Sequence, residues 1–160
     1  MINSIEYSHK DRIQVTDNAI IYELIMIDNS RIPAKTMQIK LDTGAFITVL
    51  TKKRAEKNRY EIIDGDGCAL RGFSEKGLIC DLRIIPNVVF CGYLMKNVTI
   101  ATPRDDNAIV TEVLGMNILE NFNIGLNLDK GEIFANLRND FVSQKPKYSC
   151  GEVGIFYEYS

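Results

Sequence analysis

Short segments in which every second residue is apolar recur along the chain and constrain its fold more than any other feature. In the segment that leads to Asp42, the side chains of Met37, Ile39 and Leu41 fall on one face of an extended chain. The polar residues between them fall on the opposite face, as does Asp42 itself. Such alternation is typical of a strand with one face in the core. The pattern therefore predicts that Asp42 emerges at a strand end, away from the packed face.

Further strands are predicted on the same grounds, and helices in only two short segments. The predicted strands cover residues 19–27, 36–41, 46–50, 78–85, one or two within 88–101, 124–128 and 132–137. One predicted helix follows Thr51, which suits an N-cap, and turns Ala55 inward. The other lies in the NILENF segment that begins at Asn117. This distribution predicts an all-β fold with one or two short helices.

The length of the chain, 160 residues, favours one domain with short additions at both ends. We expect the domain to span 19–140, after an N-terminal extension over 1–18 in which His9 lies in a loose segment. A tail over 141–160 combines a polar, proline-containing linker with the aromatic end GIFYEYS. Two positions are open for this end: the sheet edge of a dimer partner, or the protein's own apolar cleft.

Charge and cysteine content disfavour several classes of function. The formal net charge of −2 provides no general attraction to nucleic acid or acidic membranes. The four cysteines form no CxxC pair and the chain has one histidine, so we expect no metal and no cofactor. The N-terminus lacks a signal pattern and no apolar run approaches a membrane span, which favours a cytoplasmic protein with reduced thiols. Cys80 is predicted to lie in the core, whereas the environments of Cys68 and Cys91 stay open.

Two segments carry a resemblance to a known family. The first is KLDTGAFITVL around Asp42, and the second is VLGMNILENFNIGLNLDKGEI, which begins at Val113. In combination they resemble the retropepsin family of aspartic proteases, and within it the cellular domains of DNA-damage-inducible ubiquitin-shuttle proteins more than the viral enzymes. The resemblance spans residues 20–137. It implies a closed β-barrel that works as a twofold homodimer and hydrolyses peptide bonds.

The resemblance makes Asp42 the catalytic residue. Peptide hydrolysis by activated water needs a base and an acid, and two adjacent carboxylates supply both because they share one proton. This chain carries a single Asp-Thr-Gly triplet, so a twofold dimer would have to bring two copies of Asp42 together. In the family's pattern Thr43 holds the two active loops together, and Gly44 allows the turn and the close approach of peptide backbone.

The resemblance also assigns residues to a peptide or protein substrate. A glycine-rich flap is expected over 64–77, for which a flexible surface hairpin is the alternative. In the viral enzymes an acidic residue and an arginine form a pair at positions where this chain has Phe46 or Ile47 and Met116, so apolar packing is expected. The expected substrate-binding residues are Ala45, Phe46, Arg71, Gly72, Phe73, Val113, Leu114 and Gly115.

Two other functions stay open beside the endopeptidase. One is a non-catalytic dimerisation or peptide-binding module that retains the fold. The intact Asp-Thr-Gly triplet disfavours this alternative, because a binding module does not need the carboxylate of Asp42. The other is a subunit of a larger assembly or phage-like element in which cleavage is confined to one partner.

Overall fold

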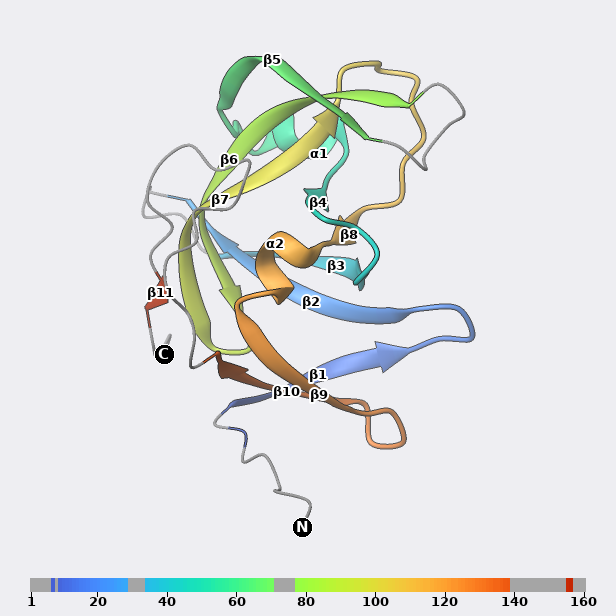
Figure 1. Cartoon of the computed structure of the whole chain (residues 1–160), viewed down its shortest axis with the longest axis vertical. Coiled ribbons are helices and arrows are strands. Elements are labelled where there is room, and N and C mark those ends of the chain that lie inside the picture. The colour runs from blue at the N-terminus through green and yellow to red at the C-terminus, as the bar shows by residue number, and fades with distance from the viewer. Residues whose placement is uncertain (1–6, 8, 29–33, 71–76, 139–154, 157–160) are drawn as a thin grey trace.

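The computed structural model describes residues 7, 9–28, 34–70, 77–138 and 155–156, with the backbone alone for 64–66 and 155–156. Eleven strands and two short helices lie in this part of the chain (Figure 1). No helix among these residues is both long and apolar enough to cross a membrane. The elements are β1 (His9–Val15), β2 (Ile20–Ile27), β3 (Lys35–Leu41), β4 (Thr48–Val49), α1 (Lys52–Lys57), β5 (Ile62–Leu70), β6 (Leu78–Phe90), β7 (Tyr93–Pro103), β8 (Val113–Leu114), α2 (Met116–Leu119), β9 (Phe122–Asn127), β10 (Glu132–Leu137) and β11 (Ile155–Phe156).

Six of these strands close a barrel. They follow one another in the order β6–β7–β4–β8–β3–β2, and β2 returns to β6 through antiparallel pairs such as Ile25 with Val89. In Figure 1 the β5–β6 hairpin lies at the top, and β1, β10 and β9 lie at the bottom. The predicted all-β closed barrel with two short helices is confirmed; the twofold dimer stays a prediction.

Strand β1 is part of the sheet, so the expectation that His9 lies in a loose segment is wrong. His9 pairs with Ala135 of β10, and its ring lies 4.1 Å from that of Tyr93, measured between centroids. The segment HKDRIQV has few apolar residues, and Ile13 alone among them is buried. Backbone pairing with both β2 and β10 holds the strand, which side-chain alternation does not predict. The domain boundaries at residues 18 and 140 stay predictions.

Local chemistry explains where several elements begin and end. The hydroxyl of Thr51 accepts a hydrogen bond from the N–H of Arg54, which caps α1, and Ala55 is buried as predicted. Between β6 and β7 the residues Cys91 and Gly92 have φ angles of 47° and 79°, the left-handed conformation of a two-residue hairpin turn. The two predicted strands around Gly92 are thus one tight hairpin.

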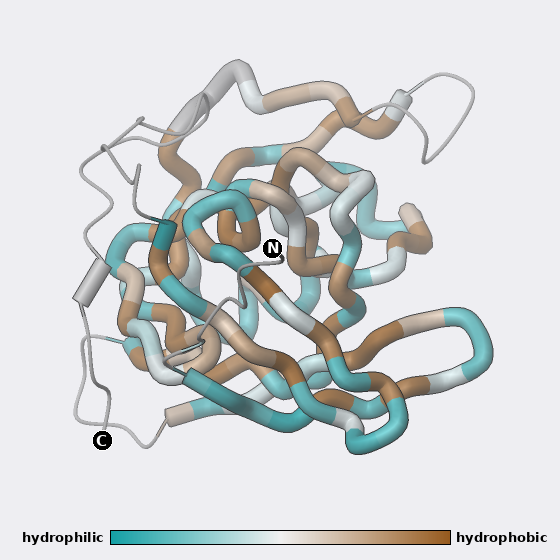
Figure 2. Tube along the Cα trace, turned by 60° about the horizontal axis from the view of Figure 1, so that its bottom comes forward, coloured by the Kyte–Doolittle hydropathy of each residue, from teal (hydrophilic) through white to brown (hydrophobic). Residues whose placement is uncertain are grey.

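The interior divides into two apolar clusters, which we name the large core and the pocket core. Figure 2 shows hydrophilic residues at the projecting turns, and hydrophobic residues that alternate with hydrophilic ones along the segments between them. The large core includes the buried side chains of Tyr22, Leu24, Ile39, Phe90, Tyr93, Leu114, Ile118 and Phe122. The pocket core consists of Ile47, Val49, Leu70, Cys80, Leu82, Ala101 and Val113.

The end of the tail pairs with the protein's own sheet. The backbone of Ile155 is the partner of Met95 and that of Phe156 the partner of Leu94, both in β7. Neither position expected for the tail describes this pairing, because β7 belongs to the same chain and these residues lie outside the pocket beside Asp42. Residues 139–154 and 157–160 lie outside the described part of the chain.

Candidate active site

Asp42 lies where β3 leaves the barrel. β3 runs parallel to β8, with Leu41 opposite Leu114, and the N–H of Asp42 donates to the carbonyl oxygen of Leu114 at 3.0 Å. Met37 is buried on the packed face of β3, whereas Asp42 is half-buried. The structure therefore presents the carboxyl group at the end of a strand, as the alternation predicts.

The turn after Asp42 fixes one oxygen of its carboxyl group. The N–H of Gly44 donates to Oδ1 at 2.9 Å, and the N–H of Ala45 donates to the main-chain oxygen of Asp42 at 3.2 Å. A Cβ atom at Gly44 would lie 3.2 Å from Oδ1 and would crowd the carboxyl group. Within the described residues Oδ2 accepts no hydrogen bond. This oxygen is available to a proton, a water molecule or a second carboxyl group.

The first residues of α2 support the turn from behind. The N–H of Met116 donates to the carbonyl oxygen of Ala45 at 2.7 Å, and that of Asn117 donates to Phe46 at 3.1 Å. Gly115 must be glycine here, because a Cβ atom would lie 2.5 Å from the carbonyl carbon of Ile47 and 2.8 Å from the oxygen of Ala45. The two segments that carry the family resemblance are therefore in direct backbone contact.

Asn117 is a supporting residue that the sequence patterns missed. Its Oδ1 accepts from both the N–H and the hydroxyl of Thr48 at 2.8 Å, and its Nδ2 donates to the carbonyl oxygen of Thr99 at 2.7 Å. The hydroxyl oxygen of Thr48 in turn accepts from the N–H of Gly115 at 3.1 Å. One amide thus links β4, β7 and the residue that precedes α2. The polar side chain of Asn117, next to the apolar Ile118 and Leu119, was the feature of the sequence that could have indicated this role.

A second link joins α1 to the chain before β8. Glu112 accepts from Nε and Nη2 of Arg54 at 2.8 and 3.0 Å, and also from the N–H of Thr51 at 3.2 Å. The hydrogen bond to Glu112 raises the pKa of Arg54, which keeps the guanidinium charged. The segment that leads to Val113 is therefore held to the N-terminal part of α1.

An open pocket of about 420 Å³ lies beside Asp42. Its lining residues are Lys40, Asp42, Gly44, Ala45, Phe46, Ile47, Val49, Leu70, Thr111 and Val113. Phe46 is 48% exposed, although it lies next to buried residues, so its ring is presented to the pocket. The lining is mostly apolar, and Lys40 adds a cation that the expected set of uncharged residues did not include.

The structure divides the predicted site residues into three groups. Asp42, Gly44, Ala45, Phe46 and Val113 line the pocket. Thr43 is exposed on the same turn, whereas Leu114 is fully buried in the large core and Gly115 is buried behind the turn. The predicted flap residues Arg71, Gly72 and Phe73 lie outside the described residues; the strands on either side, β5 and β6, form the expected hairpin.

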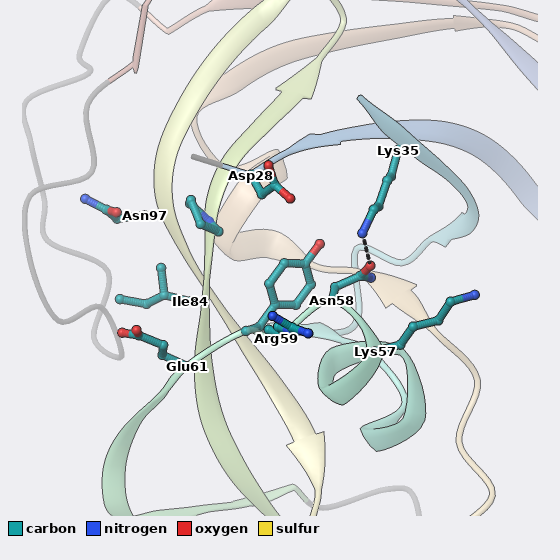
Figure 3. A pocket seen from close by; sticks show the side chains of 10 residues that line it. Asp28, Lys35, Lys57, Asn58, Arg59, Glu61, Ile84 and Asn97 are labelled. Atoms are coloured by element: carbon teal, nitrogen blue, oxygen red, sulfur yellow. Dashed lines mark hydrogen bonds between the residues drawn. The ribbon is translucent and has the colours of Figure 1, made fainter. Parts of the chain in front are cut away.

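A larger pocket of about 650 Å³ lies away from Asp42, between α1 and β6 (Figure 3). Its lining carries charges of both signs, Asp28 and Glu61 against Lys35, Lys57 and Arg59. Lys35 donates a hydrogen bond to Asn58 at 3.0 Å, which Figure 3 draws as a dashed line. No catalytic motif of the sequence lies in it. We therefore place the candidate site at the smaller pocket, where a carboxyl group is held by a rigid turn.

No cluster of metal-ligating residues lies in the part of the chain that the structure describes. No three or more histidine, cysteine, aspartate or glutamate side chains lie close enough together there to hold an ion.

Comparisons with known proteins agree with this fold. No protein-family model matches the sequence, and no curated protein does. The structure is similar to that of a retropepsin-like aspartic protease from Rickettsia conorii, with a TM-score of 0.56 and 18% sequence identity. The match covers 85% of this chain and 98% of that chain. The predicted retropepsin-like fold is confirmed. At this identity the likeness shows the fold alone.

Proposed function

We propose that the chain is an aspartic endopeptidase that acts as a homodimer, with Asp42 of each subunit as the catalytic residue. The observation that carries the proposal is the turn of Asp42: one carboxyl oxygen is fixed by Gly44, and the other accepts no hydrogen bond from the described residues. The retropepsin-like fold and the adjoining pocket support it.

The chemistry requires a second carboxyl group beside the first. Two such groups a few ångströms apart share one proton, so one acts as base toward water and the other as acid toward the peptide carbonyl. Within the described chain no other aspartate or glutamate lines the pocket of Asp42. A second copy of Asp42 across a twofold axis would complete the pair, and the exposed Thr43 would lie at the contact between the two turns.

The pocket favours an extended peptide with apolar side chains. Ala45, Ile47, Val49, Leu70 and Val113 provide an uncharged floor, on which an unpaired substrate charge would be costly to bury. Phe46 provides an aromatic surface at the rim. Cleavage between apolar residues is therefore expected, with the Lys40 side of the pocket tolerating an acidic or polar residue.

The test is digestion of a diverse peptide library by the wild type and by Asp42→Asn, read by mass spectrometry. The neutral isostere cannot share a proton, so cleavage should fall by about a hundredfold or more while folding and dimerisation persist. Asp129→Asn, in the exposed turn between β9 and β10, is the matched control and should cleave like the wild type. Equal cleavage by Asp42→Asn would contradict the mechanism. Peptide binding without cleavage by either protein would favour the non-catalytic binding module.

Dimerisation is tested separately by dilution. Specific activity should fall below the dissociation constant of the dimer, because each monomer contributes half of the carboxyl pair. Mixed dimers of wild type and Asp42→Asn should be inactive for the same reason. A monomer in sedimentation that cleaves at the full rate would contradict the shared site.

A further inference from the structure

Two reduced cysteines face each other across the hairpin that borders the pocket. Cys68 of β5 is the direct antiparallel partner of Cys80 of β6, and neither forms a disulfide. Directly opposed residues on one face of an antiparallel pair have Cβ atoms about 4.5–5.5 Å apart. Residues paired in this way have Cα atoms about 4.5 or 5.5 Å apart, within the range of about 4.4–6.8 Å that a disulfide spans. A bond between the two sulfur atoms thus requires side-chain rotation and a small approach of the strands.

The backbone before Cys68 sets this register. The ladder between β5 and β6 is irregular between Asp64 and Cys68, and Gly67 adopts a φ of 68°. A Cβ atom at Gly67 would collide with the carbonyl oxygen of Cys80, so only glycine fits. The bulge returns the strand to a regular ladder at Cys68, which places this residue opposite Cys80.

The two thiols differ in a way that suits stepwise oxidation. Cys68 is half-buried, so a small oxidant can reach its sulfur, whereas Cys80 is fully buried and donates to the carbonyl oxygen of Leu78. The guanidinium of Arg104, which pairs with Asp81, lies against Gly67, with Nη2 2.7 Å from the position of a Cβ there. Burial raises the pKa of Cys80 to about 12, and the proximity of Cys68 adds to this, so Cys80 stays protonated at neutral pH. Cys68 is therefore the attacking thiol and Cys80 the resolving one.

The pair is also connected to the candidate active site. Cys80 belongs to the pocket core, and Cys68 packs against the same cluster. Leu70, two residues after Cys68, belongs to that cluster and lines the pocket beside Asp42. A change in the distance between β5 and β6 therefore acts on the floor of the pocket.

We propose that Cys68 and Cys80 form a site of reversible oxidation by hydrogen peroxide, whose product is a disulfide across the β5–β6 hairpin that lowers peptide cleavage. The Cys68 thiolate attacks one peroxide oxygen, the O–O bond breaks, and hydroxide leaves and becomes water, which yields a sulfenic acid. The sulfur of Cys80 then attacks that of Cys68, and its proton leaves with the hydroxyl group as a second water. Two thiols are oxidised to one disulfide and one peroxide is reduced to two waters. The effect on cleavage rests on the proposed function; the disulfide itself does not.

The disulfide is detected by peptide mapping of the full chain. The reduced protein is treated with hydrogen peroxide, its remaining thiols are alkylated, and trypsin is added. Trypsin cuts after Arg71 and Lys76, so the two cysteines fall on separate peptides, 60–71 and 77–83. We expect these peptides to be linked, with the loss of two hydrogen atoms, and to separate after reduction.

Variants decide which residues form the link. Cys68→Ser and Cys80→Ser should abolish it, and Cys150→Ser, as the matched control, should retain it. A link through Cys150 or Cys91, or irreversible oxidation of Cys68 without any link, would overturn the proposal.

Cleavage is then followed at each peroxide concentration. The rate should fall by about tenfold as the link forms, because it changes the distance between β5 and β6 and so displaces Leu70 in the pocket floor, and should recover on reduction. Cys68→Ser should cleave at the basal rate with or without peroxide. A link that leaves the rate unchanged would overturn the regulatory role. A chain that never cleaves but forms the link would reject the proposed function and uphold the oxidation site.

Discussion

The two apolar clusters are built differently. The large core packs aromatic rings in tilted contacts, with the centroid of Phe90 5.0 Å from that of Tyr22 and 5.2 Å from that of Phe122, and its central residues are fully buried. The pocket core is aliphatic, and Ile47, Val49, Leu70 and Val113 belong to it while they also line the pocket. The large core therefore holds the aromatic residues away from the site, whereas the pocket core is equally buried and forms the wall of the pocket beside Asp42.

The largest expected effect comes from exchanging one aromatic residue in each region. Phe90→Ala should lower the free energy of unfolding by about 3–5 kcal/mol, because it opens a cavity in the large core. Phe46→Ala, at the 48% exposed rim of the pocket, should cost less than about 1 kcal/mol and lower peptide cleavage instead. Urea unfolding and cleavage per folded molecule measure the two effects. Equal destabilisation by both variants would remove the distinction between the regions.

The next largest effect is expected from Asn117, whose side chain links Thr48, next to the pocket, to Thr99 of β7. Asn117→Ala leaves the buried Thr48 and the carbonyl of Thr99 without their partner, which should cost about 2–3 kcal/mol. Because Thr48 also holds Gly115, behind the turn of Asp42, cleavage per folded molecule should fall as well. Asn123→Ala, on the exposed face of β9, is the matched control and should change neither quantity. Loss of stability with unaltered cleavage would show that Asn117 only supports the fold.

A smaller effect separates packing from pocket shape. Ile47→Val removes one methylene group from the pocket core and should cost about 0.5–1.5 kcal/mol. The same change deepens the pocket floor next to Asp42, so preference should shift toward larger apolar side chains in the substrate. Library cleavage by the variant and the wild type measures the shift. An unchanged cleavage pattern would place Ile47 outside the substrate contacts.

The sequence was informative where local chemistry decides the structure. Alternation located Asp42 at a strand end, the hydroxyl of Thr51 marked the start of α1, and the strands predicted over 124–128 and 132–137 correspond to β9 and β10. Each of these signals depends on neighbours in the chain, such as a period of two or a cap within one turn. The closed, retropepsin-like barrel was predicted from the resemblance of two segments to the retropepsin family, and the structure confirms this fold.

The sequence was less informative where distant residues supply the partners. β1 is mostly polar, and its place follows from backbone pairing with β10, more than a hundred residues away. Asn117 is 69 residues from Thr48, so no local pattern connects them. Cys68 lies opposite Cys80 because of the bulge at Gly67. The sequence did not predict this bulge, because the whole glycine-rich segment was assigned to a flap. The features that the sequence patterns missed thus depend on contacts between residues far apart in the chain and on one irregular residue, Gly67.

The smallest expected effect is a loss of unfolding free energy in alkaline solution. It concerns Cys80 in the pocket core and is measured separately from the large core. Burial raises the pKa of Cys80 from its ordinary 9.0 to about 12 in the folded protein. Its contribution to stability is therefore complete below pH 9 and is lost as the pH rises through 12, because the unfolded chain releases the proton first. At pH 10 the loss should be about 1 kcal/mol.

The comparison with Cys80→Ala isolates this contribution, because burial also raises the pKa values of Cys91 and Tyr22 in the large core of both proteins. Urea unfolding under reducing conditions at pH 7, 9 and 10 gives the difference in unfolding free energy between wild type and variant. This difference should be constant up to about pH 9 and then shift against the wild type. A difference independent of pH would mean that water reaches Cys80 and that the pocket core is open to solvent. In that case both thiols would be accessible to peroxide, and accessibility would no longer decide which of them is oxidised first.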